Sequence, residues 1–325
     1  MNASRFSVAV GVLSCVLAVG PSFAQDAYPS KPIRVIVPVP AGGNLDLVTR
    51  AVSERLSANV GQPVVVENRV GASSTVGTRF VAKSAPDGYT ILAMANTFLS
   101  TPAVMPAAGY DPVEEFIGVS LLARIPNVLV IPESSPFKTV MELIAHAKAK
   151  PGELTYATAG SGSVGHMAAE RFGRQVGAQF THIPYKGNAP ALVDVIGGRV
   201  AFMFDQVSTS GGHLRAGKLR ALGVTTRART ALFPDIPTLD EAGVKDFEDV
   251  TFNGFAVPAG VPREVLNKLH AEVAKALQTP ELRSRFEGQG VELVASPSYE
   301  HFTAFIRDET ARVAKLARDA KIKVE

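Results

Sequence analysis

The sequence predicts an α/β fold of two similar lobes that face each other across a ligand cleft. The chain has 325 residues, a length that suits two domains of about 150 residues each. Short β-rich runs alternate with helical patterns, which is typical of βαβ units with parallel sheets. The sequence also resembles itself at an offset of 116 residues, as at Val60-Gly61 and Val176-Gly177. This internal repeat predicts two lobes of one architecture.

The first 24 residues have the pattern of a secretory signal peptide. Arg5 precedes an apolar run over residues 6–20, and the small residues Ser22 and Ala24 predict cleavage after Ala24. The only cysteine is Cys15, inside this apolar run. Lipidation of Cys15 is the alternative, but it fits less well because the apolar run continues beyond the cysteine. We therefore expect an exported mature chain without a thiol.

Each copy of the repeat is predicted to be a βαβαβ unit. In the first copy the predicted order is strand 33–37, helix 46–58, strand 64–66, helix 75–84 and strand 89–93. In the second copy it is strand 154–157, helix 167–175, strand 180–183, helix 190–197 and strand 200–204. Gly61 and Gly177 end the first helix of each copy, as glycine does at many helix C-termini.

The remaining segments predict a discontinuous first lobe. Further strands are expected at 128–131 and 221–224, and amphipathic helices at 262–279 and 296–321. We expect the C-terminal helices to return to the first lobe. The predicted boundaries are then residues 25–125 plus 252–325 for lobe 1 and residues 126–251 for lobe 2.

Two glycine-rich turns occupy the strand-to-helix junctions of the two copies, residues 41–46 (the first turn) and residues 159–163 (the second turn). Ligands of open α/β sheets bind at this end of the strands. A helix N-terminus carries roughly +0.5 charge, and a hydrogen bond from an amide to a carboxylate contributes about 1.5–3 kcal/mol. The two turns therefore predict capture of a small carboxylate, unless the glycines serve only to make tight turns.

Three side chains near the turns are candidates for supporting roles. Asp46 and Asp205 lie at helix or strand ends, where they could contact an amine or hydroxyl of a ligand or cap backbone amides. His166 is in the first turn of a predicted helix. We expect His166 to be a cap or a hydrogen-bonding support rather than a base.

Other classes of function find less support in the sequence. A net charge of +3 from 33 basic and 30 acidic residues is too balanced for a nucleic-acid binder. The histidines lack metal-ligand spacing, so we expect neither a metal nor a cofactor. Residues 160–165 match a dinucleotide fingerprint, but no acidic residue follows at the end of the next strand. A secreted serine esterase using Ser163, Asp205 and His213 is the enzyme alternative, although no oxyanion segment precedes Ser163.

An ordered series of short motifs closely resembles the Bug-type substrate-binding proteins of tripartite tricarboxylate transporters. These motifs include residues 62–69, 85–89, 184–187, 216–221 and 257–260. The resemblance covers essentially all of the mature chain. It implies a monomeric periplasmic binding protein of the type II fold, without catalysis. It also implies hinge closure on a carboxylate solute (a di- or tricarboxylate, an amino acid or an aromatic acid) and delivery to integral membrane permease subunits.

The same resemblance implies which residues face the solute. By position they are Ala41, Gly42, Gly43, Asn44, Asp46, Thr97, Ala159, Gly160, Ser161, Gly162, Ser163, His166 and Asp205. Asn44 and Leu45 depart from the family, which usually has a third glycine and a small hydroxyl residue there. Thr97 belongs to a loop that usually carries small residues. A binding protein that signals to a membrane sensor shares this pocket and stays open as an alternative.

Overall fold

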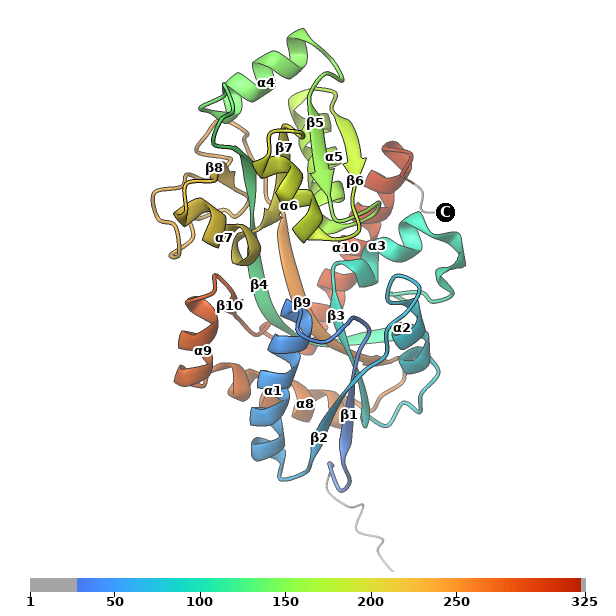
Figure 1. Ribbon diagram of the computed structural model, residues 1–325. Helices are drawn as coiled ribbons and strands as arrows, with labels where there is room; N and C mark the ends of the chain where they lie inside the picture. The colour runs from blue at the N-terminus through green and yellow to red at the C-terminus, as the bar shows by residue number, and fades with distance from the viewer. Residues whose placement is uncertain (1–27, 323–325) are drawn as a thin grey trace, which may run out of the picture.

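The computed structural model describes residues 28–322, so the predicted signal peptide, its cleavage position and Cys15 lie outside the described residues. Within this range, no helix combines the length and apolarity needed to cross a membrane. Ten strands form one sheet in the order β2-β1-β3-β9-β4-β7-β5-β6, with β8 and β10 both paired to β4. Figure 1 shows two lobes stacked along this sheet.

The first lobe contains the first copy of the repeat and the C-terminal helices. Its strands are β1 (Ile33–Val37), β2 (Val64–Asn68), β3 (Thr90–Ala95) and β10 (Glu292–Leu293). Its helices are α1 (Asn44–Val60), α2 (Thr75–Ala82), α3 (Thr97–Val104), the 3₁₀ helix η1 (Pro106–Ala108), α8 (Arg263–Leu277), α9 (Pro280–Glu287) and α10 (Tyr299–Asp319). Helices α1, α8 and α9 pack on one face of the sheet, and α2, α3 and α10 pack on the other.

The second lobe contains the second copy of the repeat. Its strands are β5 (Thr155–Thr158), β6 (Thr181–Pro184), β7 (Phe202–Gln206) and β8 (Leu219–Val224), and its helices are α4 (Val140–Ala149), α5 (Val164–Val176), α6 (Asn188–Ile196) and α7 (Val207–Arg215). β5 is parallel to β6 and β7, just as β1 is parallel to β2 and β3. Gly61 and Gly177 end α1 and α5 with φ of 70° and 64°, a left-handed conformation that glycine adopts without steric cost. The repeat in the sequence is thus a repeat of structure.

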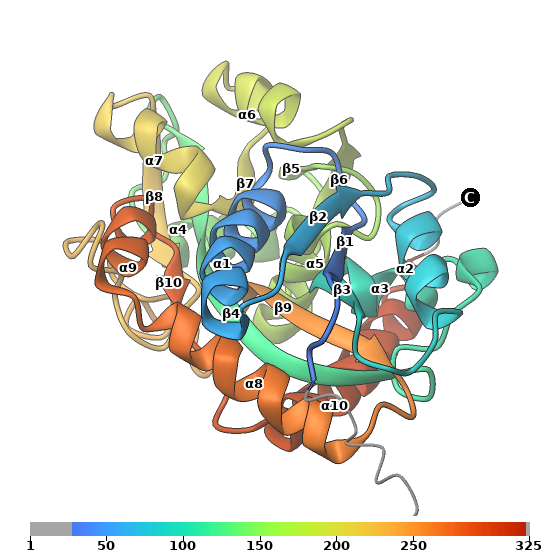
Figure 2. The same ribbon diagram turned by 90° about the horizontal axis from the view of Figure 1, so that it is seen from below.

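Two long strands connect the lobes. β4 (Phe116–Pro132) pairs with β9 (Val250–Pro258) along its first part and with β7 and β8 along its last part. Figure 2 shows β4 curving through the molecule with β9 beside it. The lobe boundaries predicted from the sequence, at 125/126 and 251/252, fall inside β4 and β9. These boundaries stay a proposal.

Several elements differ from the sequence expectation. β9 lies outside the repeat and runs antiparallel to β3 and β4, so the sheet as a whole is mixed, although the strands within each copy of the repeat are parallel as predicted. α3, α4, α7 and α9 had not been predicted. α3 is short, contains Pro102 and has no charged residue, and α7 contains Gly211 and Gly212, so neither has the usual pattern of an amphipathic helix.

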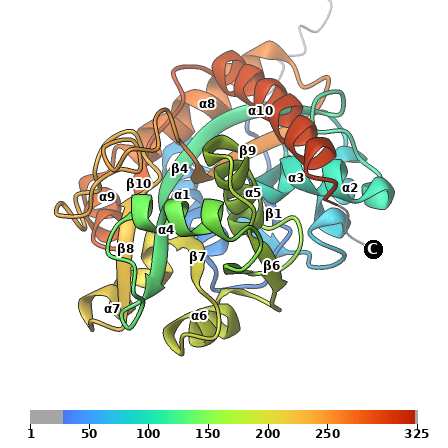
Figure 3. The same ribbon diagram turned by 90° about the horizontal axis from the view of Figure 1, so that it is seen from above.

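The last helix lies behind the cleft and contacts both lobes. Val313 and Ala317 of α10 form an apolar cluster with Val104 of α3 and Met167 of α5. Figure 3 shows α10 passing beside α3 and α5. Apolar packing therefore closes the lobe boundary at this point, next to the second turn.

Candidate functional site

The carboxyl ends of four parallel strands meet at the boundary between the lobes. β1 and β3 supply two of these ends and β5 and β7 the other two. Asn44, after β1, donates through Nδ2 to Gln206 Oε1 at the end of β7 over 2.6 Å. Ser100 of α3 donates through Oγ to the Gly162 carbonyl, after β5, over 3.2 Å. The first turn therefore faces β7 and α7, and the second turn faces α3.

Asp46 holds the first turn in place. Its side chain is 2% exposed and accepts hydrogen bonds from Gly42 N at 3.0 Å, Asn68 Nδ2 at 2.9 Å and Arg50 Nε at 3.0 Å. Burial opposes ionisation, but the hydrogen bonds from Arg50, Gly42 and Asn68 outweigh it and hold the pKa of Asp46 below its usual value. These contacts account for Asp46 as a support of the turn, and its contact with a solute stays a prediction.

Gly43 leaves an open donor at the first turn. Its φ of −77° and ψ of 166° place it at the N-cap of α1, where its carbonyl accepts from Leu47 N at 2.9 Å. Among residues 28–322, the Gly43 amide donates no hydrogen bond. An uncompensated amide at a helix N-terminus is a donor for an anion.

The second turn alternates between amides that are paired and an amide that is open. Gly160 N donates to Thr158 Oγ1 at 3.2 Å, and Gly162 N donates to His166 Nδ1 at 3.0 Å. Within the described chain, the amide of Ser161 between them has no acceptor. His166 therefore acts as the hydrogen-bonding support that its position predicts.

These pairings correct one expectation from the sequence. The sequence predicts that both glycine-rich turns present free backbone amides. The amides of Gly42, Gly160 and Gly162 are not free, because each donates to a side chain of its own turn or of an adjoining element, and the Ser163 amide donates to the Gly160 carbonyl. The sequence could not indicate this, since the acceptors reach the amides only through particular side-chain conformations.

Two separate cavities lie where the lobes meet. One of about 180 Å³ is lined by Ser73, Ser74, Thr97, Thr101, Val104, Met105 and the second turn. Another of about 240 Å³ is lined by Asn44, residues 207–209, 211–212 and 215 of α7, Leu232, Gly288 and Gln289. In this conformation Asn44 of the first turn borders one of these cavities and the second turn borders the other. That the two turns face each other across one cleft stays a prediction.

The 180 Å³ cavity contains residues that the sequence reasoning missed. Thr97 was expected there, but Ser73, Ser74 and Thr101 were not. Ser73 and Ser74 have φ of 52° and 72°, at the end of a run of small residues between β2 and α2. That run of small residues was the available signal, whereas Thr101 was hidden because α3 had not been predicted.

Asp205 joins the N-termini of two helices. Its Oδ1 accepts from Asn188 Nδ2 at 2.6 Å, and its Oδ2 accepts from the hydroxyls of Thr209 and Ser210, each at 2.5 Å. Burial raises the pKa of Asp205, and the hydrogen bonds from Ser210 and Thr209 oppose that rise. The contacts identify Asp205 as a support of α6 and α7, and a role in contacting solute stays a prediction.

The described residues do not assemble the esterase triad considered from the sequence. Ser163 Oγ accepts from His166 N at 3.4 Å as the cap of α5, and within residues 28–322 His213 contacts neither Ser163 nor Asp205. In the same range, no group of three or more His, Cys, Asp or Glu side chains could hold a metal ion.

Comparison with known proteins identifies the family to which this chain belongs. A family model described as the tripartite tricarboxylate transporter family receptor matches residues 48–322. The chain belongs to this receptor family. BugT of Bordetella pertussis is 34% identical over 331 residues, which cover 100% of both chains. These receptors are solute-binding proteins and not enzymes, so the esterase alternative is wrong.

Two solved relatives of the receptor contain bound acids. Rpa4515 of R. palustris, solved with adipate, has 34% identity and a TM-score of 0.77, and the match covers 91% of this chain and 99% of that one. MatC of Rhodopseudomonas palustris, solved with malate, has 30% identity and a TM-score of 0.74, over 89% and 99% of the chains. These matches confirm the two-lobed periplasmic binding protein fold predicted from the sequence.

Proposed function

We propose that the receptor captures a small carboxylate-bearing solute between its lobes and delivers it to the permease subunits of a tripartite tricarboxylate transporter. The observation that carries this proposal is the pair of open amides, Gly43 and Ser161, at the N-termini of α1 and α5. Both are at the strand ends where the lobes meet. The adipate and malate bound to two relatives support an acid as the solute.

The 180 Å³ cavity is the proposed solute site on the side of the second turn, and the Gly43 amide of the first turn would reach the solute only after closure. The open amide at Ser161 borders it, and the hydroxyls of Ser73, Ser74, Thr97 and Thr101 belong to its lining. None of its lining residues carries a charge. A carboxylate would therefore be held by amide and hydroxyl donors and by the positive end of α5, which suits a small acid better than a large polyanion.

Capture by hinge closure is the proposed mechanism. β4 and β9 pass side by side from one lobe to the other, so rotation of the lobes would bend these two strands. A solute favours the closed form only if it binds that form more tightly than the open one. Donors on both lobes provide this difference, because they converge on one solute only after closure.

The first experiment is a calorimetric and thermal-shift screen of residues 25–325 with adipate, malate, a tricarboxylate, glutamate and benzoate. Each acid is matched with its neutral amide as a control. At about 100 times its dissociation constant, a true solute should add roughly 2.7 kcal/mol of stability. Absence of binding by every acid, or equal binding of an acid and its amide, would contradict the proposal.

Export and delivery need separate tests. We propose that residues 1–24 are removed on export to the periplasm and that the mature receptor is a monomer. Intact mass of the periplasmic protein should show cleavage after Ala24, and light scattering gives the oligomeric state. Crosslinking of the loaded receptor in membranes should capture permease subunits, whereas capture of a sensor protein would favour the signalling alternative.

A further inference from the structure

His166 and His182 form a stacked pair beneath the second turn. Their ring centroids are 3.9 Å apart, and the ring planes differ by 15°. His166 is in the first turn of α5, and His182 belongs to β6 at the edge of the sheet. The proposed site gives no role to His182.

Each ring is connected to one of the paired amides of the second turn. His166 Nδ1 accepts directly from Gly162 N at 3.0 Å, so its proton resides on Nε2. His182 Nε2 lies 2.7 Å from Thr158 Oγ1, which accepts from Gly160 N at 3.2 Å. The two rings thus hold the amides on either side of Ser161, and they leave the Ser161 amide as the open donor.

Gly162 is also held from the other lobe. Its carbonyl, in the peptide to Ser163, accepts from Ser100 Oγ at 3.2 Å, while its amide, in the peptide from Ser161, donates to His166. The two bonds fix the peptides on both sides of Gly162 and so restrict rotation of the backbone next to the Ser161 amide. The orientation of the second turn therefore depends on an acceptor at the position of His166 Nδ1.

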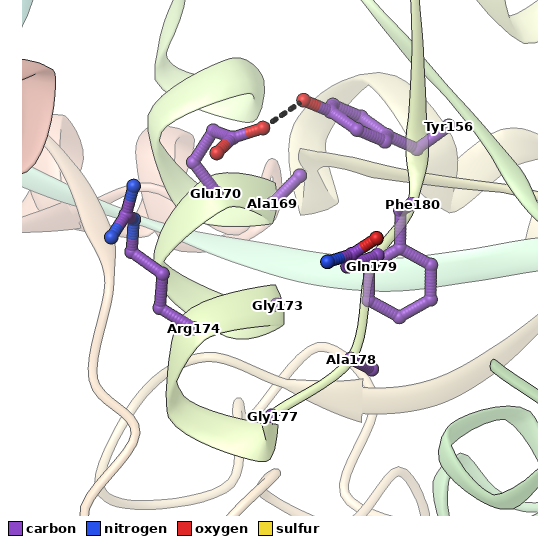
Figure 4. A pocket seen from close by; sticks show the side chains of 9 residues that line it. All are labelled: Tyr156, Ala169, Glu170, Gly173, Arg174, Gly177, Ala178, Gln179 and Phe180. Carbon is purple, nitrogen blue, oxygen red and sulfur yellow. Dashed lines mark hydrogen bonds between the residues drawn. The ribbon is translucent and has the colours of Figure 1, made fainter. Parts of the chain in front are cut away.

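The surroundings keep both rings neutral. Burial lowers the pKa of His166 to about 4, and burial together with the neighbouring His166 lowers the pKa of His182 to about 4. The other titratable groups facing the pair are Tyr156 of β5, whose ring lies 5.0 Å from that of His182, and Glu170 of α5. Glu170 is 2.7 Å from the Tyr156 hydroxyl, which donates to it. Figure 4 shows this bond beside a groove of about 570 Å³.

We propose that His166 and His182 are positioning residues for solute capture: as a neutral stacked pair they orient the second turn so that the Ser161 amide faces the solute. The proposal rests on the proposed function and deepens it. Protonation of His166 Nδ1 would remove the acceptor for Gly162. It would also place a cation at the positive end of α5, where the helix dipole disfavours it. Capture should therefore weaken at acidic pH.

The test compares two substitutions of His166 that separate its acceptor from its ring. His166→Asn retains an acceptor near the position of Nδ1 but cannot titrate, whereas His166→Phe keeps a stacking ring without an acceptor. With the acid that binds best in the screen, His166→Phe should lose roughly 2- to 12-fold in affinity at pH 7.5. The affinity of His166→Asn should stay within about threefold of that of the natural protein, because the side-chain oxygen of asparagine can accept from Gly162 in place of Nδ1.

The pH profile supplies a second readout. The ratio of the His166→Asn affinity to that of the natural protein should rise about twofold between pH 7.5 and pH 4, since half of a group with pKa 4 is protonated there. The ratio cancels the titration of the acid itself. A ratio that stays constant, or a His166→Phe variant that binds as tightly as the natural protein, would overturn the proposal.

A measurement on the natural protein keeps the test independent of how the variants fold. Nitrogen-15 NMR of the histidine side chains at pH 6 should show His166 and His182 neutral, with the proton of His166 on Nε2. A charged His166, or a proton on its Nδ1, would contradict the proposal. If no acid binds the natural protein at any pH, the proposed function fails instead, and the NMR result still decides the state of the pair.

Discussion

Asn44 donates to Gln206 over 2.6 Å although the two residues are 162 positions apart and belong to opposite lobes. Asn44 Nδ2 also lies 3.0 Å from Ser208 Oγ. Gln206 in turn lies 3.5 Å from Thr251 of β9, and Thr251 donates to Asn127 of β4 at 3.1 Å. A line of side chains thus leads from the first turn to both strands that connect the lobes.

Loss of the Asn44 amide should shift the empty receptor toward its open form. A neutral hydrogen bond contributes about 0.5–1.5 kcal/mol, so Asn44→Ala should lower the ratio of closed to open receptor by roughly 2- to 12-fold. Residues 25–325 contain no cysteine, so cysteines placed at the exposed Val65 and Val193 can carry dyes for energy transfer. Gln206→Ala should have the same effect, and the double variant little more. Additive effects would show that the two side chains act separately.

The open amide of Gly43 can be removed with little disturbance of the backbone. Its φ of −77° and ψ of 166° suit proline, and Pro262 caps α8 with φ of −58° and ψ of 143°. A Cβ at Gly43 would meet nothing within 4 Å. Gly43→Pro should weaken solute binding by about 10- to 150-fold, the value of one hydrogen bond to a charged group, while Gly43→Ala keeps the amide and binds normally. Calorimetry measures the solute affinity of both variants. Equal affinities of Gly43→Pro and Gly43→Ala would exclude the Gly43 amide from the site.

Gly165 allows α5 to lie directly against β7. A Cβ at this position would be 2.6 Å from the carbonyl oxygen of Phe204, which is backbone and cannot turn aside. Gly165→Ala should therefore reduce the unfolding free energy by about 1–3 kcal/mol and weaken solute binding, because the start of α5 must move. Gly212→Ala in α7 is the control, since its Cβ would meet nothing and alanine favours helix by about 0.5–1 kcal/mol. Urea unfolding of the two variants should give changes of opposite sign.

Asp249 should make stability depend on pH in the direction opposite to most carboxylates. Burial raises its pKa from 3.8 to about 6, although Arg312 and Arg171 oppose the rise. A raised folded pKa means that the group's contribution is fully present below pH 3.8 and is lost as pH rises through 6. Relative to the natural protein, Asp249→Asn should gain roughly 2 kcal/mol of unfolding free energy between pH 4 and pH 7. Urea unfolding at both pH values measures this difference in unfolding free energy. Asp308→Asn is a surface control that should show no such gain.

The repeated units could be predicted because each of their elements has its own local pattern. α1 and α5 show an apolar stripe followed by a terminal glycine, and the strands of both copies are short β-rich runs. β4 could not be predicted in full, because its two halves pair with different lobes and Gly118 and Pro126 interrupt the pattern between them. Pairing with strands that are far away in the sequence, such as β7, β8 and β9, leaves little trace in a local sequence pattern.

The candidate site was predictable at the level of segments but not of single donors. The glycine-rich turns follow β1 and β5, as the pattern predicts, and Asp46 and His166 lie beside them and accept from their amides. Which amides stay open depends on where those two side chains reach after folding. The cross-lobe partner of Asn44 depends on how the lobes meet, which no spacing in the sequence encodes.

The continuity of β4 has a consequence for engineering this receptor. Because one strand belongs to the sheets of both lobes, a cut at either proposed boundary would sever a strand with paired neighbours on both sides. Chimeras that exchange whole lobes with a relative would have to preserve the pairing of β4 with β9 as a unit. The segment between β8 and β9 contains neither a helix nor a strand, and it offers a better position for inserting a reporter domain that responds to the motion of the lobes.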